Sequence, residues 1–240
     1  MNEPVSWRVT AINLPEHARN PIHTDEGARA AGFPRALVAG VTTYAYMTHP
    51  LAAAWGHDWL GSGGGEVRFR SPVFQSDDVL CEASHDGETW VVSARVGDGK
   101  ARAELRGVRD AGLVPEPRGG ESLQPLVIEL VGQYGTEYGS RAGDDLTIYR
   151  AEGIVHPAVW PALANAVVHA QLARGSWIHT RSVVRHHAIV AAGSTATVHA
   201  VVVDRFHRSG ERAVIDVRIE VGGQIVATLE HEAIIALPPG

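Results

Sequence analysis

A histidine in a constrained loop is the first residue whose type and setting suit chemistry. In the tetrapeptide Asn20-Pro-Ile-His23, Pro21 fixes one backbone angle and Asn20 can hydrogen-bond its own loop, so His23 is aimed in a restricted direction. An imidazole titrates near neutral pH, which makes His23 a candidate general acid or base. The alternative is an ordinary Asn-Pro turn with His23 in solvent, and the spacing alone leaves it open.

Gly40 is a second candidate because it opens a long apolar segment that predicts a buried helix. The first N–H groups of a helix lack partners within it, and a residue without a side chain lets a ligand oxygen approach them. Gly40 and the adjacent Val41 are therefore candidate substrate-binding residues. A glycine needed only for close helix packing would leave the same pattern.

The remaining reactive residue types form no recognisable site. The 13 histidines show no spacing typical of three or four metal ligands, so we expect no metal and no cofactor. The single cysteine, Cys81, cannot form an internal disulfide. Motifs typical of serine hydrolases, phosphate loops and dinucleotide-binding proteins are absent from the sequence.

Composition predicts a soluble globular protein. The chain has 240 residues, of which 45% are hydrophobic, and its 21 Lys+Arg and 27 Asp+Glu give a net charge of −6. A mildly acidic chain without runs of like charge does not favour nucleic acid as a partner. The sequence shows no leader pattern and no run of about 18 apolar residues, so we expect a cytoplasmic protein with no membrane partner.

The chain divides into two similar halves. Three prolines and three glycines interrupt residues 111–125, which predicts a linker at 111–124 between an N-terminal unit, 1–110, and a C-terminal unit, 125–240. The halves align at an offset of 117 residues; Val38-Ala-Gly-Val matches Val155-His-Pro-Ala, and Val67-Arg-Phe matches Val184-Arg-His.

Each half is expected to contain one apolar helix followed by strands. The helices are expected at 40–54 and 157–173. Alternating, β-branched segments predict strands at 66–73, 79–83, 89–96, 101–108, 183–190, 196–203, 212–221 and 224–235. The pattern predicts an α+β fold with two antiparallel sheets, each wrapped around a long apolar central helix.

The segment that begins at Asn20-Pro-Ile-His23 and ends with Ala-Leu-Val-Ala-Gly40-Val resembles the hydratase segment of the MaoC-like dehydratases, the (R)-specific enoyl-CoA hydratases. The resemblance covers residues 18 to about 80, whereas 125–240 resemble the family only in layout. It implies a double hot-dog fold, in which two units form a pseudo-dimer, and an acyl thioester as substrate. In that family an Asp-x-Asn-Pro-x-His stretch lies above the substrate tunnel, and a His-Gly pair opens the central helix.

Two positions depart from the family pattern. The family's catalytic Asp corresponds to Ala18, and its His-Gly pair reads Ala39-Gly40. Hydration of an enoyl thioester needs a second proton-transferring group beside His23, and a small shift of the loop would bring in Glu16 or His17.

Two other residues near these positions have structural explanations. Asp25 is close to His23 in sequence, but Thr24 or Asp25 is expected to cap a helix that begins around Asp25. His156 occupies the position that matches Ala39, and we expect a structural role for it.

Four arginines fall on predicted strands at paired positions of the repeat: Arg68, Arg70, Arg181 and Arg185. They are candidates to bind the phosphates of coenzyme A or of a phosphopantetheine arm, because a guanidinium suits phosphate geometry. Of these, Arg68 and Arg185 join Asn20, Gly40 and Val41 as candidate substrate-binding residues. Solvated strand faces would explain the arginines equally well.

The resemblance and the departures together leave three functions. The first is a lyase that hydrates or dehydrates an acyl thioester carried by coenzyme A or an acyl-carrier protein, as in fatty acid metabolism. The second is a protein that binds acyl thioesters without catalysis, because Ala18 replaces the acid. The third is a thioesterase, which is less favoured because residues 41–47 offer no carboxylate. Association of the fused units into a homodimer is a weaker expectation.

Overall fold

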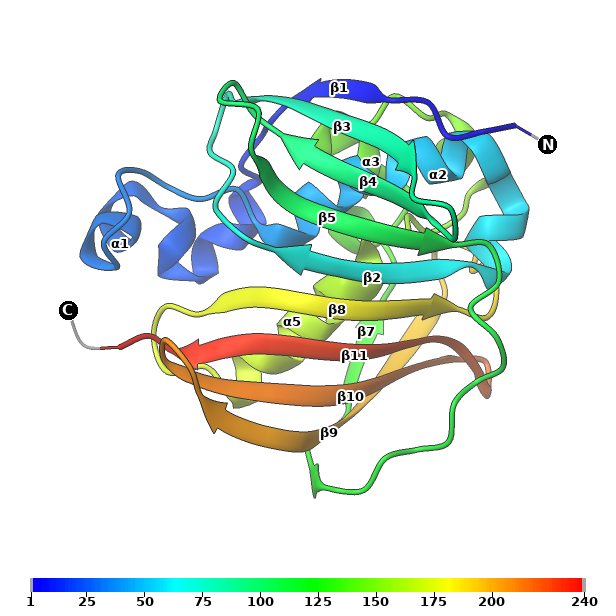
Figure 1. Cartoon of the computed structure of the whole chain (residues 1–240). Helices are drawn as coiled ribbons and strands as arrows, with labels where there is room; N and C mark the ends of the chain where they lie inside the picture. Colours follow the sequence, from blue (N-terminus) through cyan, green and yellow to red (C-terminus); the bar gives the residue numbers. More distant parts are fainter. Residues whose placement is uncertain (1, 239–240) are drawn as a thin grey trace.

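The computed structural model describes residues 2–238, and its strands form one antiparallel sheet with the long helices against one face (Figure 1). The first half contributes β1 (Trp7–Thr10), β2 (Gly64–Phe69), β3 (Asp78–His85), β4 (Trp90–Arg95) and β5 (Ala101–Val108). The second half contributes β7 (Leu126–Glu129), β8 (Ile178–His186), β9 (Thr195–His207), β10 (Glu211–Val221) and β11 (Gln224–Ala236). The two halves have the same strand order, β1-β3-β4-β5-β2 and β7-β9-β10-β11-β8.

The helices lie in corresponding places in the two units. The first half holds the short 3-10 turns η1 (Pro15–Arg19) and η2 (Pro21–His23), then α1 (Asp25–Ala30) and the long α2 (Gly40–Ser62). The second half holds η3 (Gly132–Tyr134), α3 (Glu137–Ala142), α4 (Ile148–Glu152) and α5 (Val159–Gln171). Nearly every residue of α2 from Val41 to Ala52 is buried, which explains why the segment is apolar on all sides.

The expectation of two separate sheets needs a correction. The two half-sheets join edge to edge, because β2 pairs with β8 from Gly64↔Arg185 to Arg68↔Arg181. Unpaired N–H and C=O groups on an edge strand are costly to bury, and this pairing satisfies both edges at once. The result is one continuous sheet that curves past both α2 and α5 (Figure 1).

The internal repeat is confirmed by backbone contacts that recur at the same offset of 117 residues. The bridge Leu37↔Phe74 has its counterpart in Ile154↔Ala191. Ser76 and Gly193, also 117 residues apart, both have positive φ, 66° and 87°. The two units therefore share turn geometry as well as sequence.

Helix boundaries differ from expectation for local reasons. Helix α2 runs to Ser62, but its backbone leaves the helical region at Gly56 (φ 51°, ψ −132°), so the expected end at 54 lies just before this kink. Thr24 caps α1 by accepting a hydrogen bond from the Gly27 amide at 3.1 Å, which confirms the expected cap.

The connection between the halves runs from β5 to the far edge of the second half-sheet (Figure 1). On this path the two-residue strand β6 (Glu121–Ser122) pairs with β9. Among the helices of residues 2–238, none combines the length and apolar composition needed to cross a lipid bilayer.

Gly64 tests the importance of the β2–β8 junction. A Cβ atom at Gly64 would lie 2.2 Å from the carbonyl oxygen of Val184, so Gly64→Ala must displace the backbone of β8. We expect the free energy of unfolding, measured with urea, to fall by about 1–3 kcal/mol. Gly97→Ala is the matched control, since a Cβ there meets nothing within 4 Å. Equal stability of the two variants would contradict the prediction.

Candidate active site

A cavity of about 260 Å³ lies between the two units, next to the start of α2. The first unit supplies the η2 loop, the beginning of α2 and the end of β2, and the second unit supplies parts of α5, β8, β10 and β11. Its lining consists of Asn20, Ile22, His23, Phe33, Leu37, Val38, Gly40, Thr43, Phe69, Arg70, Ser71, Pro72, Val73, Asn165, Trp177, Ile178, His179, Thr180, Arg212 and Ile234.

His23, at the end of η2, lines this cavity. The alternative of an ordinary Asn-Pro turn with His23 exposed to solvent is therefore wrong. Its Nδ1 lies 2.8 Å from the carbonyl oxygen of Leu37. A carbonyl can only accept, so Nδ1 carries the hydrogen and Nε2 keeps its lone pair. Burial lowers the pKa of His23 to about 4, although the hydrogen bond to Leu37 opposes this effect. At neutral pH His23 is therefore an uncharged base.

Asn20 connects the loop that carries His23 to the second unit. Its side-chain amide donates to the carbonyl oxygen of Trp177 at 2.9 Å, and its Oδ1 accepts from the Trp177 amide at 3.4 Å. Asn20 is 3% exposed. Because both polar atoms contact Trp177, the amide holds the loop in place against the entry to β8.

The beginning of α2 presents free backbone donors. The amides of Thr42 and Thr43 already donate to the carbonyl oxygen of Ala39, at 2.9 and 3.0 Å, whereas the amides of Gly40 and Val41 precede the first full helical turn. Gly40 lines the main cavity, and a Cβ there would lie 3.4 Å from Nδ1 of His179. Val41 lines a smaller pocket beside it.

Glu16 and His17 both line this smaller pocket, which shares Asn165 with the main cavity. The carboxylate of Glu16 accepts two hydrogen bonds from Arg141, at 2.8 and 2.6 Å. Partial burial alone would raise the pKa of Glu16, but Arg141 holds it below its usual value. Glu16 is thus committed to an ion pair outside the main cavity.

His17 lies beside His23, with 5.8 Å between the ring centroids. Its Nε2 is 3.2 Å from Oγ1 of Thr42 and 3.4 Å from the hydroxyl of Tyr138. Burial, followed by the proximity of His23, lowers the pKa of His17 to about 4. His17 is a neutral neighbour of His23 rather than part of the main cavity wall.

Arg68 and Arg185, the two arginines among the candidate substrate-binding residues, lie outside the cavity lining. Arg68 forms an ion pair with Glu66 at 2.6 Å and its side chain is 55% exposed. Arg185 sits opposite Gly64 in the β2–β8 junction. The arginines that line the cavity are Arg70, just past the end of β2, and Arg212, at the start of β10.

Sequence reasoning missed two cavity residues from the second unit, His179 and Asn165. Nδ1 of His179 and Oδ1 of Asn165 are buried and have no hydrogen-bond partner among the described residues. Neither residue belongs to a local motif, because each reaches the cavity only through the packing of the second unit on the first.

The corresponding place in the second unit is filled. His156, the counterpart of Ala39, is fully buried, and its Nε2 lies 3.2 Å from the carboxylate of Asp144. The ring of Tyr149 packs on it with 4.4 Å between centroids. This arrangement agrees with the structural role expected for His156, whose side chain fills the space at the second helix start that Ala39 leaves open at the first.

Comparison with known proteins supports the resemblance. Residues 16–105 match the family model described as MaoC like domain. This part of the chain is similar to a MaoC-like domain. The match covers the η1 and η2 loops, α2 and strands through most of β5, so it includes every first-unit residue of the cavity. A search of curated proteins gives no match.

Solved structures establish the fold of the whole chain. RV0216 from Mycobacterium tuberculosis, described as a double hotdog fold, shares 14% identity over 98% of this chain and 96% of its own, with a TM-score of 0.67. A MaoC domain protein from Chloroflexus aurantiacus shares 12% identity over 98% and 96%, with a TM-score of 0.62. The dehydratase domain of RzxB from Pseudomonas fluorescens shares 14% over 83% and 86%, with a TM-score of 0.54. The expected double hot-dog fold is confirmed.

The buried histidines should make the fold sensitive to mild acid. Burial lowers the pKa of five of them from 6.5: His17, His23, His179, His186 and His231. Between pH 6.5 and pH 4 these imidazoles bind protons in the unfolded chain but not in the folded chain. The free energy of unfolding is therefore highest above pH 6.5 and decreases as the pH falls toward 4. Together these residues should lower the free energy of unfolding by at least about 2 kcal/mol between pH 7 and pH 5, as measured by urea unfolding.

Carboxylates with ordinary pKa values stay ionised over this interval, so the comparison isolates the histidines. The control is His23→Gln, which removes one titrating group and should reduce the difference between the two pH values. A free energy of unfolding that is the same at pH 7 and pH 5 would rule the prediction out.

Proposed function

We propose that this protein is a hydratase or dehydratase of acyl thioesters. The observation that carries the proposal is that one cavity is lined both by His23, whose Nδ1 is held by Leu37 so that Nε2 keeps its lone pair, and by Gly40 at the start of α2. The first group can move a proton at neutral pH, and the second can stabilise negative charge on a carbonyl oxygen.

The hydration step follows from these two groups. His23 Nε2 takes a proton from water while the water oxygen bonds to the β-carbon of the enoyl thioester. The electron pair of the C=C bond moves toward the thioester oxygen, which accepts hydrogen bonds from the first amides of α2. The imidazolium of His23 then returns its proton to the α-carbon, so that water has been added and the base restored. Dehydration is the reverse sequence.

Two features favour this chemistry over the other candidates. The cavity lining, as far as residues 2–238 describe it, contains no Asp or Glu, which disfavours a thioesterase that needs a carboxylate at the helix start. Arg70 and Arg212 also line the cavity; their guanidinium groups pair with Glu104 and Glu232, and the phosphates of a carrier would share them with these carboxylates. Ala18 remains the reason to consider a protein that binds thioesters without converting them.

Removal of His23 tests the assignment. We expect His23→Ala to hydrate trans-2-butenoyl-CoA at least about a hundredfold more slowly than the wild type, because the cavity then lacks its fixed base. The loss of enoyl-thioester absorbance in the ultraviolet measures the rate. His85→Ala is the matched control, since His85 lies at the exposed end of β3, contacts the Gly87 amide and the Trp90 ring, and is not among the residues that line the cavity. An unchanged rate in His23→Ala would remove His23 from the mechanism.

The pH profile tests the protonation state. Because the active form of His23 is neutral and its pKa is about 4, kcat/KM should stay level through pH 6.5 and fall only as the pH approaches 4. Initial rates measured from pH 4.5 to 8, with folding verified at each pH, give the profile. An acid limb centred near 6.5 would show that a different, exposed group carries the reaction.

A further inference from the structure

A β-bulge turns His179 toward the cavity. In the β8–β11 ladder, Arg181 pairs with Glu232 and His179 with Ala233, so Thr180 is an extra residue without a partner. Residues three apart in a regular strand face opposite sides, but the bulge places His179 and Ser182 on the same, buried side.

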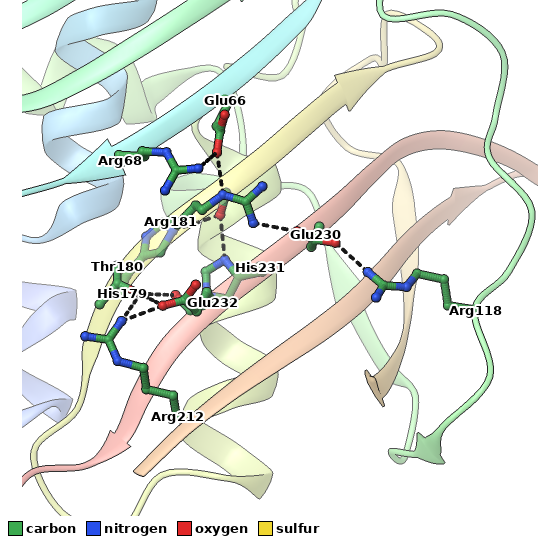
Figure 2. A network of polar contacts seen from close by, with 11 residues as sticks. Glu66, Arg68, Arg118, His179, Thr180, Arg181, Arg212, Glu230, His231 and Glu232 are labelled. Carbon is green, nitrogen blue, oxygen red and sulfur yellow. Dashed lines mark hydrogen bonds and ion pairs between the residues drawn. The ribbon is translucent and has the colours of Figure 1, made fainter. Parts of the chain in front are cut away.

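Contacts on the other side of the sheet hold this bulge in place (Figure 2). The hydroxyl of Thr180 donates to Glu232, and the guanidinium of Arg181 pairs with Glu66 from β2 and with Glu230 from β11. The bulge is therefore fixed by polar contacts that include the junction between the two units.

On the buried side, three side chains form one chain of hydrogen bonds. Nε2 of His179 lies 2.8 Å from Oγ of Ser182, which lies 2.8 Å from Nδ1 of His231. The two imidazoles stack with 4.2 Å between their centroids, and Ser182 and His231 are both 0% exposed. Burial lowers the pKa of His179 and of His231, so both rings are neutral near pH 7.

The serine hydroxyl has a single hydrogen, so it couples the tautomers of the two rings. When Ser182 donates to His179 Nε2, the hydrogen of His179 must be on Nδ1, and His231 donates from its own Nδ1 to Ser182. In the opposite arrangement His179 donates from Nε2 to Ser182 and Ser182 donates to Nδ1 of His231, so Nδ1 of His179 carries no hydrogen. His179 can therefore offer a donor at Nδ1 without carrying a charge.

This Nδ1 atom faces the open helix start. It is buried without a partner among the described residues, on a side chain that is 6% exposed. It lies 3.4 Å from where a Cβ of Gly40 would stand, and the ring of Phe69 packs on the imidazole with 4.7 Å between centroids. A carbonyl oxygen bound at the amides of Gly40 and Val41 is thus within reach of His179.

We propose that His179 Nδ1–H is a second hydrogen-bond donor to the thioester oxygen of the substrate, supplied by the second unit, and that Ser182 and His231 position it in this tautomer. The inference rests on the proposed thioester substrate and adds to it a specific donor group. The first unit would supply the base and the backbone donors, and the second unit a side-chain donor for the charge that develops on oxygen.

The carbonyl stretch of bound [1-13C]butyryl-CoA tests the inference, because this saturated thioester cannot be hydrated. Binding to the wild type should shift the infrared band to lower wavenumber, and His179→Phe should reverse part of that shift. Ser182→Ala should reverse a smaller part of the shift. Ser182→Thr, which keeps the hydroxyl, should show the full shift of the wild type. In hydration of trans-2-butenoyl-CoA, His179→Phe should lower kcat about tenfold to a hundredfold with little change in KM.

The control is His187→Ala, one residue past the end of β8, because His187 bonds Thr228 and is not among the residues that line the cavity. Its bound carbonyl should match that of the wild type. Identical carbonyl bands in bound wild type, His179→Phe and Ser182→Ala would overturn the inference while leaving the proposed function intact. Failure of the wild type to bind butyryl-CoA would overturn the proposed function, and the inference with it.

Discussion

The antiparallel pairing of β2 with β8 is the interaction on which the rest of the structure depends. Each half-sheet alone would present an edge of unsatisfied N–H and C=O groups, and joining the two edges satisfies both. The pairing also fixes the register of the two units, because Gly64 allows the backbone of Val184 to approach closely. The cavity lies between the two units that this junction joins.

The cavity itself follows from the asymmetry of two similar units. At the first helix start the small residues Ala39 and Gly40 leave space, whereas at the second the ring of His156 fills the corresponding position and bonds Asp144. The open space therefore lies at the first helix start, and residues of both units line it. Asn20 links the two units, since its side-chain amide connects the loop that carries His23 to the backbone of Trp177 across the interface.

Burial determines the chemistry that the imidazoles can perform. His17 and His23 lie close together, yet their low pKa values keep both neutral, so neither imidazole adds a positive charge near the cavity. A neutral imidazole with one nitrogen fixed by a carbonyl is a defined acceptor at the other nitrogen, which is what the Leu37 contact gives His23. The proposed reaction uses this property in place of the carboxylate that Ala18 does not supply.

The sequence by itself determined the elements and the repeat. Alternation of apolar residues predicted most strands to within a few residues, and the loop from Asn20 to His23 with Gly40 was recognisable because its residues are close in the chain. The tertiary structure alone decided that the sheets join, that Glu16 is bound to Arg141, and that Arg70 and Arg212 line the cavity instead of Arg68 and Arg185.

His179 shows the physical reason for this division. Periodicity assigns a face to each residue of a regular strand, but the extra residue at Thr180 changes the face of everything before it, and this bulge arises from pairing with β11 far along the chain. Local patterns are set by neighbours in sequence and can be read from it. Contacts between the two units depend on how the strands pair, and only the folded chain determines them.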